Sequence, residues 1–239
     1  MPLPQTPSFR LDGRRALVAG ASSGIGRAAA VALAQAGARV TLLARQADNL
    51  VLLQSEMRAE GLEADYLALD ICDTAKMEST LAAQAPYEIL VNSAGLARHS
   101  PALQTIESDY DAVTNVNVKA AYFLTRAVAK SLVGTQRSGS LINVSSQMGL
   151  VGGIDRAVYC ATKHALEGMT KAMAVEWGPH KIRVNTLCPT FTRTPLAEQT
   201  LSIPARRKWI EDQIKLGRIA EVEDLMGAVV FLASDAAAM

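Results

Sequence analysis

The sequence has almost no net charge and no long apolar stretch. Its 239 residues include 24 lysines and arginines against 23 aspartates and glutamates, which gives a formal net charge of +1. Proteins that bind nucleic acid or anionic membranes normally carry a basic excess, so neither partner is expected. The best apolar stretch, 225–233, contains Gly227 and is far shorter than the roughly 20 residues of a membrane-spanning helix. The N-terminus also lacks the apolar core of a signal peptide.

Cysteine and histidine are equally scarce. The cysteines are Cys72, Cys160 and Cys188, and the histidines are His99, His164 and His180. They never cluster at the spacing of metal ligands, so no metal site is expected. Scattered cysteines without a CxxC motif are typical of reduced thiols, which favours a cytoplasmic protein. The absence of a GxSxG motif argues against a serine hydrolase, and we expect no special role for any histidine.

Short apolar runs instead alternate with helix-like segments along the chain. The runs are continuous in Val, Leu and Ile, which is typical of strands buried on both faces of a parallel sheet. Between them, 26–36 is rich in alanine, and Leu50, Leu53 and Met57 fall on one helical face. This alternation predicts a single α/β domain over 1–239, with helices on both faces of the sheet. The predicted strands are Ala16–Ala19, Val40–Leu43, Tyr66–Leu69, Ile89–Val91, Leu141–Val144 and Val184–Leu187.

A glycine-rich loop, 20–26 (GASSGIG), joins the first predicted strand to the first predicted helix. Glycines allow a sharp turn and a close approach of the backbone to a pyrophosphate, and the following helix N-terminus offers free N–H groups. Because the loop lies between a strand and a helix, it predicts a dinucleotide-binding site.

The GxxxGxG spacing of this loop resembles the short-chain dehydrogenase/reductase family, and three further motifs agree with it. Residues 92–95 (NSAG) are similar to the family's NNAG element. Ser146 lies thirteen positions before Tyr159, and Lys163 completes the family's Ser…YxxxK signature. The similarity extends from about Leu11 to Ser234 and implies a doubly wound Rossmann-type fold.

The resemblance implies the roles of individual residues. The catalytic residues would be Asn117, Ser146, Tyr159 and Lys163. The cofactor would be bound by Gly20, Ser22, Ser23, Gly24, Ile25, Gly26, Arg45, Asp70, Ile71, Asn92, Ala94, Gly95, Tyr159, Lys163, Pro189, Thr192 and Thr194. The substrate would contact Ser146, Met148, Ile154, Tyr159, Thr190 and Phe191. The family also implies a homo-oligomer, a tetramer or dimer, formed through the long helices that follow Asp109 and Ala157.

The chemistry of the tyrosine can be argued from the residues themselves. Tyr159 and Lys163 are four apart, so on a helix they lie one turn from each other on one face. A nearby ammonium favours the phenolate, so we expect the pKa of Tyr159 to be lowered from about 10. Such a phenol can exchange a proton with a substrate hydroxyl while hydride moves. His164 should point to another face of this helix.

The end of the second predicted strand indicates which nicotinamide cofactor is used. An acidic residue there would bind the ribose hydroxyls of NAD, but this chain has Ala44 followed by Arg45. A guanidinium can hold a 2′-phosphate with two parallel hydrogen bonds. We therefore expect NADP rather than NAD.

The sequence departs from the family pattern in a few places. Ala19 replaces a threonine that usually braces the NNAG turn, and Ser93 replaces the second asparagine of that turn. Thr190 follows Pro189 where glycine is usual, and a β-branched residue there should narrow the site. The family also continues beyond Ser234 into a further strand, so we expect the final strand to be missing from this sequence.

The substrate is left open by these motifs. It should bind between 148–154 and 190–217, whose basic residues we expect on an exposed mobile loop. The first hypothesis is an NADP-dependent oxidoreductase that interconverts a secondary alcohol and a carbonyl of a sugar, a polyol or a small ketone. A 3-oxoacyl-[acyl-carrier-protein] reductase is the alternative, and Arg126, Lys130 and Arg137 could then bind the carrier. A non-catalytic nicotinamide-binding sensor or scaffold is the rival from another class.

Overall fold

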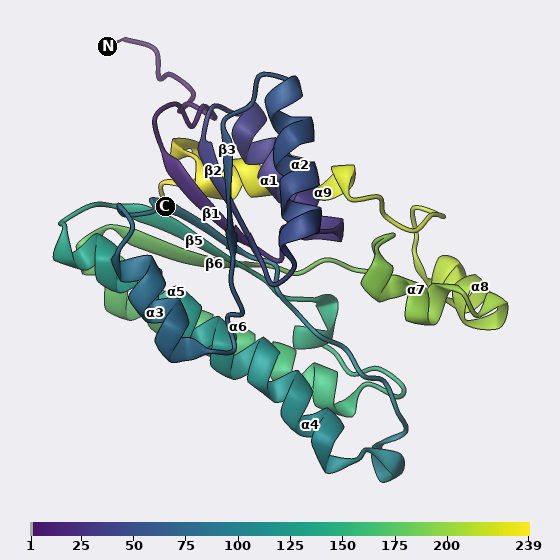
Figure 1. The fold of residues 1–239 in the computed structure, drawn as a ribbon. Coiled ribbons are helices and arrows are strands. Elements are labelled where there is room, and N and C mark those ends of the chain that lie inside the picture. Colours follow the sequence, from purple (N-terminus) through teal and green to yellow (C-terminus); the bar gives the residue numbers. More distant parts are fainter. Residues whose placement is uncertain (1) are drawn as a thin grey trace.

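Six strands form one parallel sheet in residues 2–239, the part of the chain that the computed structural model describes (Figure 1). The strands follow the order β3-β2-β1-β4-β5-β6. Each coincides with a predicted apolar run to within two residues. Their bounds are β1 Arg15–Ala19, β2 Arg39–Ala44, β3 Ala64–Ala68, β4 Ile89–Asn92, β5 Gly139–Val144 and β6 Ile182–Leu187.

Helices follow the strands in the predicted alternation. Their bounds are α1 Gly24–Gln35, α2 Ala47–Ala59, α3 Thr74–Ala82, α4 Glu107–Thr114, α5 Ala121–Gly134, α6 Ala157–Trp177, α7 Pro195–Leu201, α8 Pro204–Gln213 and α9 Glu223–Ala233. The apolar face predicted for α2 is confirmed, because Leu50, Leu53 and Met57 are all buried. A π-helical turn, Asn115–Ala120, joins α4 to α5.

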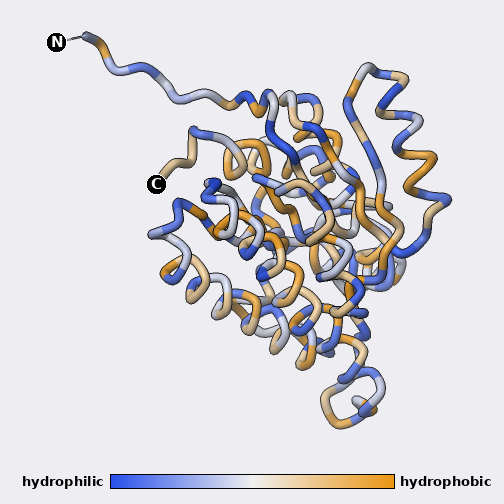
Figure 2. Tube along the Cα trace, turned by 60° about the vertical axis from the view of Figure 1, so that its left-hand side comes forward, coloured by the Kyte–Doolittle hydropathy of each residue, from blue (hydrophilic) through white to orange (hydrophobic). Residues whose placement is uncertain are grey.

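The two faces of the sheet are covered by different helices (Figure 1). Ala16 and Val18 of β1 pack in one core with Leu33 of α1. Leu17 points to the opposite face and packs in a second core with Leu124 of α5. Figure 2 shows the apolar colour concentrated along the strands and on the helix faces turned toward them. Because side chains alternate along a strand, one continuous apolar run serves both cores.

The edge strand β3 does not fit this pattern. Tyr66 is 42% exposed, and Asp65 is ion-paired with Arg58 at 2.8 Å. The prediction of a strand buried on both faces is therefore wrong for β3. In residues 2–239, β3 pairs with β2 alone and forms an edge of the sheet.

The order of the strands determines where a ligand can bind. The chain runs outward from β1 to β2 and β3, then returns to β4 on the other side of β1. At this switch point the loops leave β1 and β4 in opposite directions, which opens a crevice at the carboxyl ends of the strands.

The segment expected as a mobile loop is instead helical. It forms α7 and α8, which stand away from the body of the sheet in Figure 1. A small core of Leu201, Ile210 and Ile219 holds them together. Three of its arginines are ion-paired as well: Arg193 with Glu221, Arg206 with Asp155 and Arg207 with Glu211.

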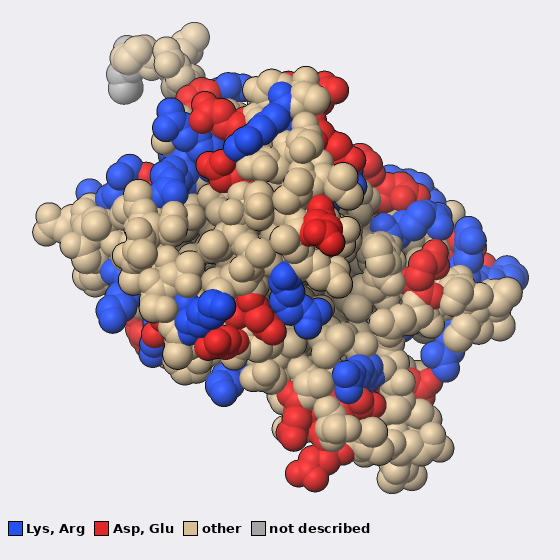
Figure 3. Space-filling view, viewed as in Figure 1, with Lys and Arg blue, Asp and Glu red and all other residues tan. Residues whose placement is uncertain are grey.

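The charged side chains are interspersed by sign on the surface seen in Figure 3. This agrees with the near-neutral composition, because positive and negative side chains lie beside one another across the face shown. In the described part of the chain, no helix combines the length and the apolar character that crossing a membrane requires.

Candidate active site

The glycine loop follows β1 directly and needs glycine for two separate reasons. Gly20 has φ +74°, and a Cβ there would lie 2.8 Å from the backbone of Ser93. A Cβ on Gly26 would lie 2.7 Å from the carbonyl carbon of Gly20. The loop is thus closed on itself, and it presents the N-terminus of α1 to the crevice. The free N–H groups and the positive end of the helix dipole at this N-terminus favour a bound anion.

Main-chain bonds tie the loop to its neighbours. The Ser93 N–H donates to the Ala19 carbonyl at 2.9 Å, and the Gly20 N–H donates to the Leu43 carbonyl at 2.9 Å. The ends of β1, β2 and β4 are therefore joined without a side-chain hydroxyl at position 19. The departures from the family pattern at Ala19 and Ser93 leave this junction intact.

A cleft of about 400 Å³ runs along the carboxyl ends of these strands, and we call it the long cleft. It brings together most of the residues expected to bind the cofactor. The expected residues that line it are Gly20, Ser22, Ser23, Gly24, Ile25, Arg45, Asp70, Ile71, Ala94, Gly95, Tyr159, Lys163 and Thr194. Gly26 and Asn92 are buried and do not line the long cleft, whereas Pro189 and Thr192 line a neighbouring cavity.

Asn117 lies below the long cleft and is 1% exposed. Its amide accepts a hydrogen bond from the Leu96 N–H at 2.8 Å and donates to the Leu96 carbonyl at 2.9 Å. It also donates to the Thr162 hydroxyl at 3.1 Å. The asparagine therefore clamps the segment after β4 to helix α6, and its Oδ1 lies 3.6 Å from the position of a Cβ on Gly95.

Tyr159 and Lys163 lie on one face of α6, as their spacing predicted. The Lys163 Nζ is 5.6 Å from the centre of the Tyr159 ring and donates to the Val144 carbonyl at 2.8 Å. Ser146 lies close enough to the phenol to lower the pKa of Tyr159 in part, and its Oγ accepts from the Met148 N–H at 3.1 Å. The three side chains thus converge from the turn after β5, which carries Ser146, and from α6, which carries Tyr159 and Lys163. His164 is exposed on another face of the helix.

The expectation of a lowered tyrosine pKa is wrong for this set of side chains. Burial raises the pKa of Tyr159, and the nearby Ser146 hydroxyl and the Arg156 charge offset only part of this effect. Burial also lowers the pKa of Lys163 to about 8, against the opposing influence of Cys188 and Glu167. At neutral pH the phenol is therefore protonated, and Lys163 carries its charge.

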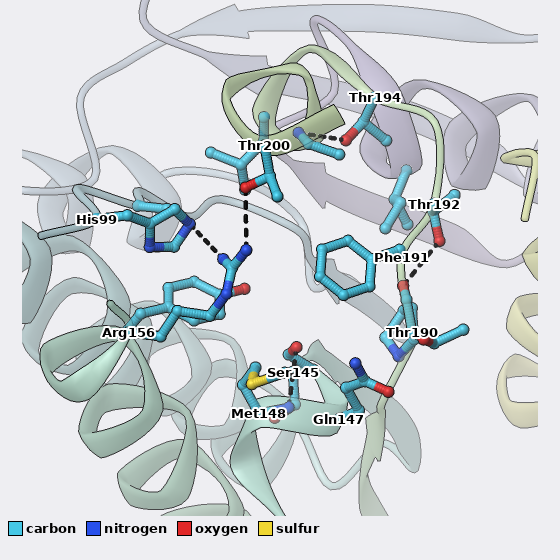
Figure 4. Close-up of a pocket in the computed structure, with 17 residues that line it drawn as sticks. His99, Ser145, Gln147, Met148, Arg156, Thr190, Phe191, Thr192, Thr194 and Thr200 are labelled. Atoms are coloured by element: carbon cyan, nitrogen blue, oxygen red, sulfur yellow. Dashed lines mark hydrogen bonds between the residues drawn. The ribbon is translucent and has the colours of Figure 1, made fainter. Parts of the chain in front are cut away.

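A second, smaller cavity lies beside the tyrosine, and we call it the tyrosine cavity (Figure 4). Five of the six residues expected to contact substrate line it: Ser146, Met148, Tyr159, Thr190 and Phe191. Ile154 does not, because it is 83% exposed and lines an adjoining outer groove. Tyr159 lines both the tyrosine cavity and the long cleft.

Two unexpected side chains, His99 and Arg156, also line the tyrosine cavity. The Arg156 guanidinium bonds to the His99 Nε2 at 2.6 Å and donates to the Thr200 hydroxyl at 2.9 Å (Figure 4). Burial, with the charges of Arg156 and Arg206, lowers the pKa of His99 to about 4. The ring is therefore neutral, and its Nε2 accepts from the guanidinium, which leaves the proton on Nδ1.

Comparison with known proteins identifies the family. Residues 14–203 match the model of the family described as short chain dehydrogenase. The chain belongs to this family. Short chain dehydrogenases are oxidoreductases, and the strand order and converging motifs described above are those of this fold.

Individual relatives match almost the whole length of this chain. D-Erythrulose reductase of Gallus gallus is 42% identical over 98% of this chain and 93% of that protein. L-Xylulose reductase of Bos taurus is 42% identical over 97% of this chain and 93% of that protein. Among solved structures, a gluconate 5-dehydrogenase from Burkholderia cenocepacia J2315, in complex with NADP and tartrate, superimposes with a TM-score of 0.92. It is 33% identical over 96% of this chain and 91% of that one.

Three residues at the tyrosine cavity were not predicted from the sequence, and the signals that could have indicated them differ in strength: Arg156, His99 and Thr200. Arg156 lies three positions before Tyr159 and immediately before α6, so its nearness to the tyrosine in the sequence was the available signal. His99 had only a weak signal, its position shortly after β4 in this short chain dehydrogenase. Thr200 had none, since the helix that carries it was expected to be a loop.

Proposed function

We propose that this short chain dehydrogenase is NADP-dependent and interconverts a secondary alcohol and a carbonyl of a sugar or polyol by hydride transfer. One observation carries the proposal: Tyr159 lines both the long cleft and the tyrosine cavity. A cofactor in the cleft and a substrate in the cavity would therefore meet at its phenol. The relatives that act on D-erythrulose and L-xylulose favour a sugar-like substrate, and the NADP-bound relative favours NADP.

The residues of the long cleft fit a phosphorylated dinucleotide. Gly20 and Gly26 pack closely against backbone and have no side chains, so a pyrophosphate can approach the free N–H groups at the N-terminus of α1. Arg45 is exposed at the end of β2 and lines the cleft. Within residues 2–239 it has no ion pair, so its guanidinium is available to a 2′-phosphate.

Each reacting side chain has a distinct task. When bound, NADP(H) supplies or accepts the hydride. Tyr159, protonated at neutral pH, gives its proton to the oxygen of the substrate in reduction and takes it back in oxidation. Ser146 holds that oxygen beside the phenol. Lys163 places a positive charge near the ring and thereby assists loss of the phenol proton.

Neither alternative function is favoured by a specific observation. A carrier-protein docking patch would need free basic groups. Arg126 is paired with Glu78, and Arg137 is paired with Glu88. A non-catalytic sensor would have no need for the tyrosine, serine and lysine to converge.

Turnover of a substrate panel tests the proposal. The panel contains ketoses, polyols, β-ketoesters and acyl thioesters, with NADPH or NADP followed by absorbance. We expect turnover with ketoses or polyols and with NADPH rather than NADH. Tyr159→Phe should lower kcat/KM by about a hundredfold to ten-thousandfold, the usual contribution of a general acid–base. Undiminished turnover in Tyr159→Phe would refute the mechanism.

A further inference from the structure

We propose that the substrate carries a carboxylate and that Arg156 binds it within the tyrosine cavity. This inference rests on the proposed function, because it names the substrate class of the same site. Within the class of sugars and polyols proposed above, it singles out the sugar acids, which carry a carboxylate beside the reacting alcohol or carbonyl.

The first argument is that Arg156 has no counter-charge. Its two side-chain bonds go to His99 and Thr200, which are both neutral. Within the described residues no carboxylate lies within ion-pair distance of it. Asp155, whose charge acts on Arg156 from the adjacent position, is instead ion-paired with Arg206 at 2.7 Å.

The second argument is the cost of this arrangement. Burial disfavours the charged guanidinium of Arg156, as the direction of its pKa shift shows. Half-buried charges are normally paired, because desolvation is expensive without a compensating partner. The ring of Phe191, whose centre is 5.3 Å from the guanidinium carbon, gives only partial compensation. The site therefore has a positive charge that a bound anion would neutralise.

The third argument is position. Arg156 immediately precedes α6 and contacts the His99 Nε2 at 2.6 Å, and the His99 ring lies edge-on to the Tyr159 ring with the ring centres 5.7 Å apart. His99 therefore bridges Arg156 and Tyr159. Arg156 and Tyr159 both line the tyrosine cavity, and Figure 4 shows the Arg156 guanidinium between His99, Thr200 and Phe191. A guanidinium has five N–H donors, and two of its nitrogens each make one bond here, which leaves donors for a carboxylate. An acid held at Arg156 would thus have its reacting carbon only a few bonds away, at the phenol.

Matched pairs of ligands separate charge from shape. L-Tartrate, D-gluconate and D-xylonate would be compared with L-threitol, D-glucitol and xylitol, in which each carboxylate is replaced by a hydroxymethyl group. Dissociation constants would be measured by calorimetry on the enzyme with NADP bound. We expect at least one acid to bind tenfold or more tighter than its alditol. Arg156→Gln should raise the dissociation constant of that acid by about tenfold to a hundredfold, which is the effect of losing a charge-assisted pair.

The matched control is Arg207→Gln on α8. Arg207 is exposed and paired with Glu211 at 2.9 Å, and it lines none of the three cavities described above. Its substitution should leave the preference for acids unchanged, and thermal melting would establish that both variants are folded. The inference is overturned if no acid binds better than its alditol, or if Arg156→Gln keeps the affinity within twofold.

Tyr159→Phe keeps the two proposals distinguishable, because it retains Arg156. A preference for acids that Arg156→Gln removes, together with undiminished turnover in Tyr159→Phe, would refute the catalytic mechanism alone. Lost turnover in Tyr159→Phe without any preference for acids would refute the carboxylate site alone.

Discussion

Replacing Asn117 with alanine should destabilise the protein and loosen the long cleft together. The substitution removes three hydrogen bonds and leaves the N–H and carbonyl of Leu96 without their partners. Each buried main-chain group left unpaired costs about 1–3 kcal/mol. With two such groups, the free energy of unfolding should fall by about 2–6 kcal/mol. That is a large part of the roughly 5–15 kcal/mol typical of a native protein.

Urea denaturation of Asn117→Ala measures this loss, and Asn115→Ala is the matched control. Asn115 lies in the same π-helical turn but is only partly buried, and it makes no side-chain hydrogen bond within the described chain. Gly95 and Leu96 line the long cleft, so the KM for NADPH should also rise in Asn117→Ala. If Asn117→Ala loses no more stability than Asn115→Ala, the hydrogen bonds of Asn117 do not contribute to the free energy of unfolding.

Two further predictions concern charge. Burial holds the pKa of Lys163 at about 8, below its ordinary 10.5, so between those pH values the unfolded chain binds a proton that the native chain does not. The free energy of unfolding should therefore rise with pH across this window, by up to about 3 kcal/mol relative to Lys163→Met. Denaturation of both proteins at pH 7.5 and 10.5 measures this, and parallel profiles would contradict it. Arg45→Asp should raise the KM for NADPH by about tenfold to a hundredfold and leave that for NADH the same or lower. An unchanged ratio of the two KM values would remove Arg45 from phosphate binding.

The sequence predicted the parts of the site that depend on local constraints. The glycine loop was recognisable because only glycine tolerates the φ of +74° at Gly20 and the close packing at Gly26. Tyr159 and Lys163 were placed on one face because helical spacing alone decides it. The strands were predictable because a parallel sheet buried on both faces needs continuous apolar runs.

The remaining parts depend on contacts between distant segments. The bonds from Arg156 reach His99 and Thr200, which are 57 and 44 positions away in the sequence. The pKa of Tyr159 could not be predicted because burial, the largest influence on it, is set by the whole fold. The helices α7 and α8 were missed because their polar sequence offers only a small apolar core.

The π-helical turn at Asn115–Ala120 makes the length of the chain at this point as important as its chemistry. A π turn closes with bonds from residue i to i+5, so it holds one residue more than an α-helical turn. Removing one residue would restore a regular helix and rotate α4 by about 100° relative to α5. Val113, which is 1% exposed, would then turn away from its packing partners. In this chain the position of Asn117 therefore depends on the extra residue of the π-helical turn as well as on its own hydrogen bonds.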